Sequence, residues 1–272
     1  MSKKKLYSMA KKIILILFIL IMAFPFIYLL KLSIQPQKDI FEVPIRFFPS
    51  GIKLDNYLEV MKLFPLLNQL LNSLIYAVST TILTVLTAAM AAYGLAKLKV
   101  PGSRLFILFF IATMLLPPEI RAIPMYTLMA KFKWVDTWQG MIIPLATTGF
   151  AIFFIYQYMI TIPDEMLEAA RIDGASELQL LIFIILPLSK TSLATMGLYN
   201  FLFRWRGFIW PLIMTRGSVT TLSVGLSELK TGEGLMQWNL IGSATMFLLL
   251  PSLILFLCLR KYIMKAIAVN LK

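Results

Sequence analysis

The sequence predicts an all-α membrane protein with six transmembrane helices, because it is strongly apolar and contains six windows that suit a bilayer crossing. Hydrophobic residues make up 59% of the 272 residues, whereas soluble domains contain about 45–50% apolar residues. A helix needs about 20 mostly apolar residues to cross the hydrocarbon core. We expect a single transmembrane domain over residues 1–272, with spans at about residues 13–30, 71–96, 105–123, 141–160, 191–213 and 241–259.

The first window follows a cluster of lysines at positions 3, 4, 5, 11 and 12. A secretory signal peptide combines such a basic segment with small residues at a cleavage site, and no such site follows the window. We therefore expect residues 13–30 to be a retained membrane anchor.

Basic residues close to the membrane indicate the orientation of the spans. Counted over the whole chain, Lys and Arg divide almost equally between the two sides, so the prediction depends on the segments next to the spans. Three such segments fall on one side, which we expect to be the cytoplasm. Because the number of spans is even, both termini are expected there. The segments are the amino-terminal lysines, the loop with Lys97, Lys99 and Arg104, and the tail with Arg260, Lys261, Lys265 and Lys272.

Several residue types that catalysis or metal binding would need are missing. The chain has no histidine, the commonest general base and transition-metal ligand. It has no G-x-x-x-x-G-K-[ST] phosphate loop, and the single cysteine, Cys258, permits neither a disulfide framework nor a cysteine zinc site. The net charge of +13 does not indicate nucleic acid, because the basic residues occur on both faces of the membrane. We expect neither a catalytic nor a metal site, and energy for transport must come from a partner or an ion gradient.

Two alternatives remain open on composition alone: an ion-coupled secondary carrier and a non-transporting membrane scaffold. Ion-coupled carriers usually place ionisable groups within their spans and show internal repeats. The sequence has no convincing repeat and no acidic residue at the middle of a predicted span, which disfavours a carrier.

Residues 161–187, between the fourth and fifth spans, predict a cytoplasmic helix-turn-helix. Thr161 is a candidate amino-terminal cap, and Pro163 suits a first helical turn. Asp164 and Glu165 complement the positive end of the helix dipole. We therefore expect a helix to begin near Thr161.

The turn and the second helix have signals of their own. Gly174 stands where a left-handed residue would end the first helix, and Ser176 with Gln179 forms a capping-box pattern that begins another. The first helix is short and marginal alone, so it needs a surface to rest on. The small pair Ala169 and Ala170 would let another protein approach closely.

This segment resembles the signature of the permease subunits of ABC importers, in which it is the coupling helix that docks into a groove on the ATPase. The resemblance implies that Leu167, Glu168, Ala169, Ala170, Gly174 and Arg171 couple the chain to the ATPase. Glu168 would make a polar contact, Gly174 would set the turn, and Pro187 would end the second helix. The matching positions are Glu168-Ala169-Ala170, three residues, Gly174, nine residues, Ile184, one residue and Leu186-Pro187.

Further segments are similar to carbohydrate-uptake permeases of the maltose and glycerol-3-phosphate type. This similarity implies the smaller of two unlike permease subunits in a bacterial cytoplasmic membrane, with a separate ATPase dimer that binds ATP and Mg, and an extracellular or periplasmic solute-binding protein. It implies no cofactor or enzymatic activity in this chain, and a carbohydrate or a sugar or polyol phosphate as substrate. The segments are Asn72-Ser73-Leu74, Ala91-Ala92-Tyr93-Gly94-Leu95-Ala96-Lys97, Ile162-Pro163-Asp164-Glu165 and Trp210-Pro211-Leu212.

The fifth predicted span departs from that family, because Arg204 and Arg206 flank Trp205 where many sugar permeases carry Trp-Asn followed by an acidic or polar residue. A charge at the bilayer centre costs at least about 2.5–3.5 kcal/mol, so these arginines are not expected to face lipid. They could line a watery cavity and meet an anionic substrate, pair with acids of the second permease subunit, or reach the outer headgroups.

Other residues join this candidate substrate path. Pro117-Pro118 predicts a kink at the end of the third span, beside the charged residues Glu119 and Arg121, which could meet substrate or form a surface ion pair. Tryptophans could stack on sugar rings or anchor the chain at the interface. The candidate path comprises Asn200, Arg204, Trp205, Arg206, Trp210, Glu119 and Arg121.

Overall fold

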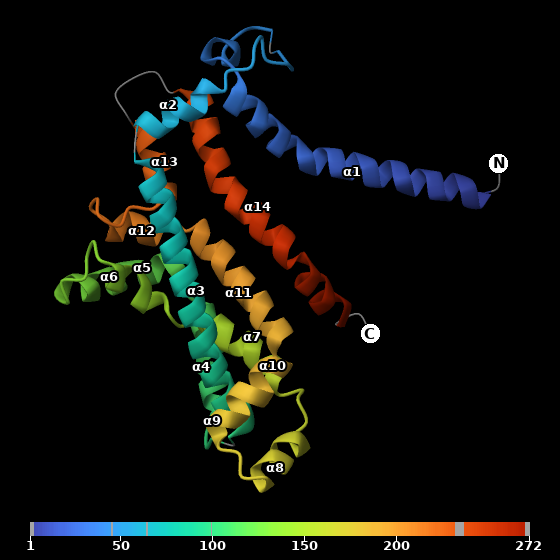
Figure 1. The fold of residues 1–272 in the computed structure, drawn as a ribbon, viewed down its shortest axis with the longest axis vertical. Coiled ribbons are helices and arrows are strands. Elements are labelled where there is room, and N and C mark those ends of the chain that lie inside the picture. Colours follow the sequence, from blue (N-terminus) through green and yellow to red (C-terminus); the bar gives the residue numbers. More distant parts are fainter. Residues whose placement is uncertain (1–2, 45, 64, 99, 232–236, 270–272) are drawn as a thin grey trace. The chain divides into compact units, whose positions relative to one another are not determined.

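The computed structural model describes residues 3–44, 46–63, 65–98, 100–231 and 237–269, with side chains omitted at 3–6, 229–231 and 259–269. Within these ranges every regular element is helical (Figure 1). Lys99 and the side chains of the basic tail, on which the predicted orientation partly depends, lie outside the described residues. The elements are α1 (Lys3–Ile34), η1 (Gln37–Ile40), α2 (Asp55–Leu63), α3 (Leu66–Lys97), α4 (Ser103–Met114), α5 (Pro118–Lys131), α6 (Trp138–Ile142), η2 (Ile143–Leu145), α7 (Gly149–Met159), α8 (Glu165–Ile172), α9 (Glu177–Gln179), η3 (Leu180–Ile185), α10 (Leu186–Leu188), α11 (Lys190–Trp205), α12 (Ile209–Met214), α13 (Leu222–Thr231) and α14 (Trp238–Val269).

Among the described residues, three helices are long and apolar enough to cross a membrane by themselves: Tyr7–Ile34, Leu66–Lys97 and Trp238–Cys258. Three more candidate spans are pairs of helices bent at a short break, which gives up to six spans if each pair is one span. The pairs are Ser103–Met114 with Pro118–Lys131, bent by 101°, Trp138–Leu145 with Gly149–Met159, bent by 43°, and Glu177–Leu188 with Lys190–Trp205, bent by 78°. The first, second and sixth predicted spans are thus continuous helices.

The predicted third span, residues 105–123, is not one straight helix. The chain turns after Met114, and α5 begins at Pro118. A proline at position 118 lacks the N–H that would bond the carbonyl of residue 114 in a continuous helix, and its ring would clash with that carbonyl. The kink expected at the proline pair is therefore a full break.

The predicted fifth span, residues 191–213, is also wrong as a single helix. Helix α11 ends at Trp205, and α12 begins only at Ile209. Pro211 cannot donate a hydrogen bond to the carbonyl of Gly207, four residues earlier. That carbonyl instead accepts a hydrogen bond of 2.7 Å from the hydroxyl of Ser223.

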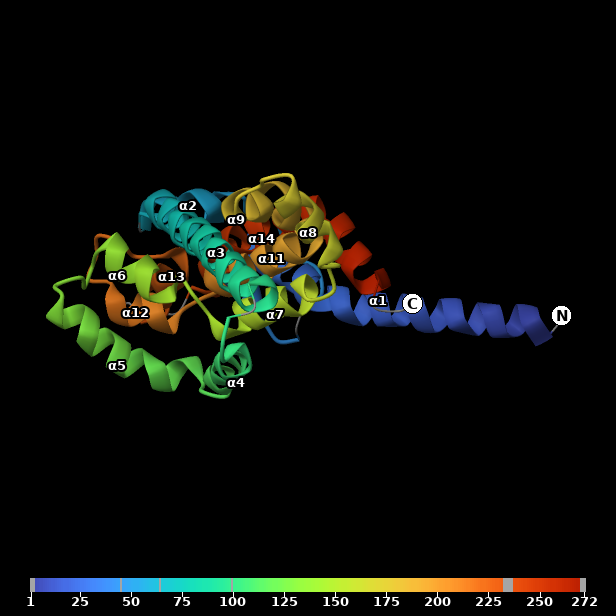
Figure 2. The same ribbon diagram turned by 90° about the horizontal axis from the view of Figure 1, so that it is seen from below.

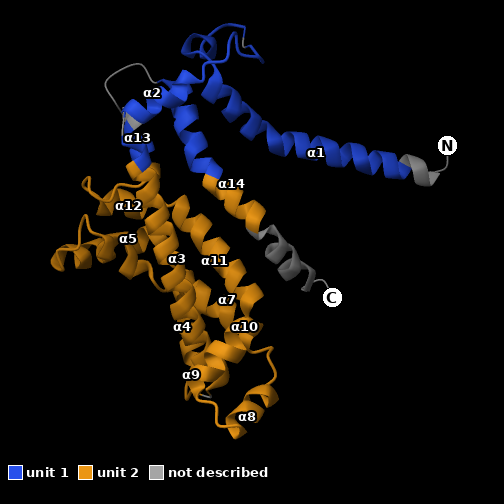
Figure 3. Cartoon of the chain, viewed as in Figure 1, with its two compact units in different colours: residues 1–67, 225–250 blue, residues 68–224, 251–272 orange. Residues whose placement is uncertain are grey.

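The chain divides into two compact units (Figure 3), residues 1–67 with 225–250 and residues 68–224 with 251–272. In the first unit, the end of α1, α2 and the start of α14 share a buried polar network. The amide of Asn56 donates to the carbonyls of Ser33 and Gln35, at 3.0 and 3.1 Å, and accepts from Asn239 at 2.9 Å. The hydroxyl of Ser243 donates to the Ser33 carbonyl at 2.8 Å. This network satisfies groups that lipid could not.

In the second unit, α3 packs beside α11 (Figures 1 and 2), and their sides meet at small and polar residues. A Cβ at Gly197 would lie 3.9 Å from the methyl group of Thr81, and the Thr81 hydroxyl donates to Asn200 at 3.3 Å. Helix α7 contacts both α4 and α11. Small residues at such contacts let helices approach closely in a membrane.

Gly149, the first residue of α7, provides a test of the α4–α7 packing. A Cβ there would lie 2.5 Å from the carbonyl oxygen of Phe110 and would also collide with the Thr113 hydroxyl. We expect Gly149→Ala to destabilise the protein by about 1–3 kcal/mol, the usual cost of overpacking, and to lower the Tm in detergent. Gly94→Ala is the matched control, because nothing lies within 4 Å of a Cβ at that position. Equal Tm values for the two variants would contradict this packing.

Candidate functional site

The first helix of the 161–187 segment, α8, begins later than the sequence predicts. The amides of Leu167 and Glu168 donate to the carbonyl of Asp164, which is the cap residue. Thr161 does not cap this helix, since its hydroxyl donates to the carbonyl of Tyr158 at 2.7 Å and closes the end of α7. The cause is local geometry: Thr161 still belongs to the turn that follows α7.

The turn and the second helix follow the predicted signals closely. Gly174 has a φ of +89°, in the left-handed region, and Ser176 and Gln179 form a complete capping box. The second helix runs through α9, the π-helical turn η3 and α10, and ends at Leu188, one residue after Pro187. The π-helical turn precedes the proline, whose missing N–H disturbs the regular bonding pattern.

The two faces of α8 differ in exposure. Leu167 is only 1% exposed and packs into the core of the second unit, whereas Glu168 and Ala169 are exposed. Met166 and Ile172 are apolar yet 46% and 86% exposed. Leu167 therefore fixes α8 to its own chain, and the exposed face is what another protein could contact.

The end of α3 ties down both helices of this segment, a feature that the sequence analysis missed. The Nζ atom of Lys97 donates to the carbonyl of Ile162 at 2.5 Å and to the carboxylate of Asp164 at 2.7 Å. The Lys97 side chain is 3% exposed. One helical turn earlier, the Tyr93 hydroxyl donates to the carboxylate of Glu177. We call Tyr93 and Lys97 the α3 tether.

Arg171 completes the contact around Glu177. Its Nε donates to the Glu177 carboxylate at 2.8 Å, so Arg171 serves this chain's own fold. The hydrogen bonds from Arg171 and then Tyr93 lower the pKa of Glu177 below its usual value of 4.5. This contact therefore contributes stability above pH 4.5 and loses it as the pH falls through the lowered pKa.

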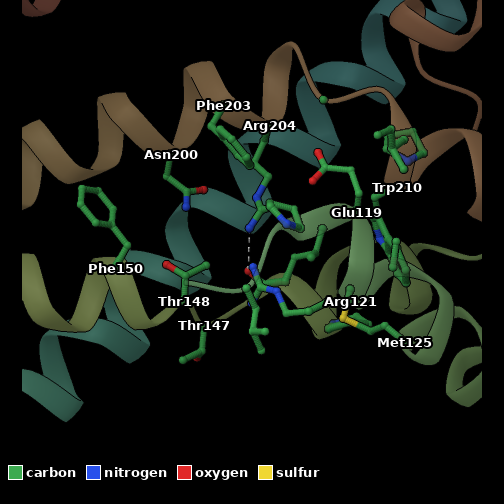
Figure 4. Close-up of a pocket in the computed structure, with 18 of the residues that line it drawn as sticks. Glu119, Arg121, Met125, Thr147, Thr148, Phe150, Asn200, Phe203, Arg204 and Trp210 are labelled. Atoms are coloured by element: carbon green, nitrogen blue, oxygen red, sulfur yellow. Dashed lines mark hydrogen bonds between the residues drawn. The ribbon is translucent and has the colours of Figure 1, made fainter. Parts of the chain in front are cut away.

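A cavity of about 660 Å³ lies within the second unit, and Figure 4 shows many of the side chains around it. It brings together six of the seven residues of the candidate substrate path, from α5, α11, α12 and the break between the last two. These are Glu119, Arg121, Asn200, Arg204, Arg206 and Trp210. The seventh, Trp205, is 1% exposed and stacks on Phe201 with ring centroids 5.7 Å apart, so it belongs to the core.

Arg204 is buried at the cavity wall, with a relative exposure of 8%. Its Nη2 donates to the carbonyl of Leu145 at 3.4 Å, and its side chain hydrogen-bonds with the hydroxyl of Tyr76. Its Nε has no hydrogen-bond partner among the described residues. Arg206 differs, because it is exposed and its Nε donates to the carbonyl of Leu202 at 3.3 Å.

The other members of the cavity wall have defined positions. Trp210 donates from its indole N–H to the carbonyl of Met141 at 3.2 Å, so its ring is held in place by the fold. Glu119 and Arg121 are both exposed and, among the ion pairs formed by the described residues, they do not pair with each other. The alternative of a surface ion pair between them is therefore not seen.

Comparison with known proteins places the chain in a family of transport proteins. Residues 84–269 match the family described as "Binding-protein-dependent transport system inner membrane component". The chain belongs to this family. It is accordingly a multi-pass membrane protein, a permease subunit of an ABC importer and not an enzyme, with nucleotide binding on a separate ATPase. The ion-coupled carrier and the scaffold are thereby set aside.

Individual relatives cover most of the chain. The sn-glycerol-3-phosphate transport system permease protein UgpE of Salmonella choleraesuis (strain SC-B67) is 32% identical over 255 residues, 91% of each chain. UgpE of Pectobacterium atrosepticum is 29% identical over 263 residues, 94% of each chain. A bacterial ABC transporter involved in the import of the acidic polysaccharide alginate has the same fold, with a TM-score of 0.85, 24% identity and coverage of 96% of this chain and 98% of that one.

Substitution of Lys97 tests whether the α3 tether holds the start of α8 in place. Removing a charged partner of a buried hydrogen bond costs roughly 1.5–3 kcal/mol, so Lys97→Met should loosen the start of α8. We expect amides at 165–169 to exchange hydrogen about tenfold faster or more in mass spectrometry. Lys131→Met, an exposed lysine at the end of α5, should leave this exchange unchanged. Unaltered exchange in Lys97→Met would refute the tether.

Proposed function

We propose that the chain is one of two unlike permease subunits of an importer that moves a carbohydrate, or a sugar or polyol phosphate, into the cell. The relatives named UgpE are sn-glycerol-3-phosphate permeases, and the structural neighbour imports a polysaccharide. A related structure is a complex with an alginate pentasaccharide-bound periplasmic protein. Delivery by a solute-binding protein fits the description of the family.

The segment 161–187 is the contact with the ATPase in this proposal. The observation that carries it is the division of α8 into two faces: Leu167 is buried in this chain, while Glu168 and Ala169 are exposed beside the uncovered apolar side chains of Met166 and Ile172. Exposed apolar groups rimmed by charge are typical of a protein interface. The α3 tether holds this surface in a fixed position, so that movement of the ATPase would reach the spans.

The cavity is the part of the substrate path that this chain provides. It combines hydroxyl and amide groups with aromatic rings, and these suit the hydroxyls and the apolar faces of a sugar. Helices α5 and α12, which contribute to its wall, lie well away from α8 (Figure 1). The arrangement separates an energy-receiving end from a substrate-holding end, as alternating access requires.

Docking is tested by co-purification of the tagged chain with its partners from membranes. We expect Glu168→Lys to reduce the recovered ATPase at least tenfold, because it reverses the charge on the exposed face of α8. Deletion of residues 162–174 should abolish recovery of the ATPase. Glu165→Lys, exposed on the first turn of the same helix, is the matched control, and the second permease subunit should co-purify with all variants. If the ATPase remains bound in Glu168→Lys and in the deletion, the docking assignment fails.

Orientation is tested with two cysteines in a Cys258→Ser background. With both termini in the cytoplasm, Phe47 should face the outside and Leu178, in the 161–187 segment, the cytoplasm; the side chains are 84% and 64% exposed. In intact cells, a membrane-impermeant maleimide should label Phe47→Cys and should not label Leu178→Cys until the membrane is opened. The reverse pattern would overturn the proposed topology.

A further inference from the structure

The cavity carries more positive charge than the residues described in the structure balance. Its charged lining residues are Arg121, Arg204 and Arg206 against the single acid Glu119. Among the residues that the structure describes, no carboxylate oxygen lies within 4.0 Å of any of these three guanidinium groups. An excess of two positive charges therefore surrounds a space within the membrane-spanning part of the protein.

Arg204 is the most costly of these charges to leave uncompensated. Burial of a cation costs several kcal/mol unless an anion and further hydrogen bonds offset it. The guanidinium has five N–H donors, but its described acceptors are only the Leu145 carbonyl and the neutral Tyr76 hydroxyl, and Nε has none. The fold thus holds a desolvated guanidinium with unused donors at the wall of the cavity.

Arg121 reaches into the same space from α5, on the opposite side (Figure 4). Both guanidinium groups line this one cavity, and neighbouring like charges disfavour each other. Like charges so placed are stabilised when an anion binds between them. A guanidinium fork matches the oxygens of phosphate or carboxylate, often in a bidentate manner.

The rest of the wall suits the remainder of a sugar or polyol. The Asn200 amide and the hydroxyls of Thr147 and Thr148 supply neutral hydrogen-bonding groups, and the rings of Phe150 and Trp210 supply apolar faces (Figure 4). Such a wall binds a ligand that is anionic at one end and polyhydroxylated over the rest.

We propose that Arg204 and Arg121 form an oxyanion subsite that binds the acid group of an anionic carbohydrate, either a phosphate monoester or a uronic acid carboxylate. This inference rests on the proposed function and narrows its substrate class. Arg204 is the principal ligand because it is buried and its Nε lacks an acceptor among the described residues. Arg206 is exposed, and its Nε donates to the Leu202 carbonyl. Its main contribution is therefore to the positive electrostatic potential of the cavity.

The competing explanation is that an acidic side chain of the second permease subunit pairs with these arginines and neutralises their charge. In that case the complete importer would have a neutral cavity, and small anions would not concentrate there. The test therefore uses the assembled importer in nanodiscs. It measures the electrostatic potential inside the cavity and the binding of small anions there. The natural substrate need not be identified for either measurement.

A cysteine at Thr147, introduced with Cys258→Ser, reports on the cavity. Its rate of modification is measured with methanethiosulfonate reagents bearing either a sulfonate or a trimethylammonium group. We expect the anionic reagent to react about tenfold faster, since a charged cavity raises the local concentration of counter-ions. Arg204→Gln should abolish this preference, Arg204→Lys should retain most of it, and Lys131→Gln should not change it.

Protection then identifies the acid group. Inorganic phosphate, glycerol 3-phosphate and glucuronate are each added before the anionic reagent, with glycerol as the neutral control. We expect protection by the phosphate compounds, by glucuronate, or by both, and which of them protects distinguishes the two acid classes. No protection by glycerol is expected, and protection should weaken at least tenfold in Arg204→Gln.

Two results would overturn the subsite: an anionic preference that survives Arg204→Gln, or failure of all three anions to protect in the complete importer. Either result is distinguishable from failure of the proposed function, which appears as loss of ATPase from the purified complex. The Arg204→Gln importer must therefore still contain the second permease subunit and the ATPase, which also shows that the variant has folded.

Discussion

Backbone groups that lack hydrogen-bond partners are very costly in lipid, and this constraint determines where the cavity lies. Non-helical backbone is tolerated at membrane depth only where it is buried in protein or lines a cavity. Three interruptions of the helices in the second unit, at residues 115–117, 146–148 and 206–208, all contribute to the wall of the cavity. At two of these breaks a side chain donates to a backbone carbonyl: Thr87 to Ala146 at 2.7 Å, and Ser223 to Gly207 at 2.7 Å.

Helix α3 connects this cavity with the 161–187 segment. It is one continuous helix of 32 residues, so that Tyr76 at the cavity and Lys97 at the tether are separated by about 30 Å at 1.5 Å per residue. Thr84 and Thr87 of the same helix donate to carbonyls of the break before α7. In the proposed coupling, a displacement of α8 would act on a continuous helix that also supports the cavity wall. No chain of separately moving side chains is needed between the two ends.

Features that depend on neighbouring residues were predicted more accurately from the sequence than features that depend on residues far away in the chain. Gly174 and the Ser176–Gln179 box were predicted correctly because each signal acts within a few residues. The prediction of a single helix over 191–213 was wrong because it relied on apolar composition and did not give enough weight to Gly207 and Pro211, which together break the helix.

The separate environments of Arg204, Arg206 and Trp205 could not be predicted, since burial of each depends on helices far away in the sequence. The two-residue spacing of the arginines indicates that their side chains point in different directions, but it does not show which of them is buried. Lys97 was used for the membrane orientation and as part of a family-like segment, and no structural contact was predicted for it. A lysine that follows an apolar helix is usually solvated, and nothing local shows that its ammonium group meets Asp164, 67 residues away.

The contrast between Lys97 and Arg204 separates a structural cation from one that needs a ligand. Both side chains are buried, yet the fold gives the ammonium group of Lys97 a carbonyl and a carboxylate, which compensate its charge. Arg204 receives one carbonyl at 3.4 Å, a neutral hydroxyl and the Phe203 ring, whose centroid lies 5.5 Å from the guanidinium carbon, and a second guanidinium lines the same cavity. A buried charge needs compensation wherever it occurs, and no acid among the residues that the structure describes forms an ion pair with Arg204. The deficit lies at the helix breaks, where the cavity provides space, and this position is the reason for proposing that the substrate supplies the anion.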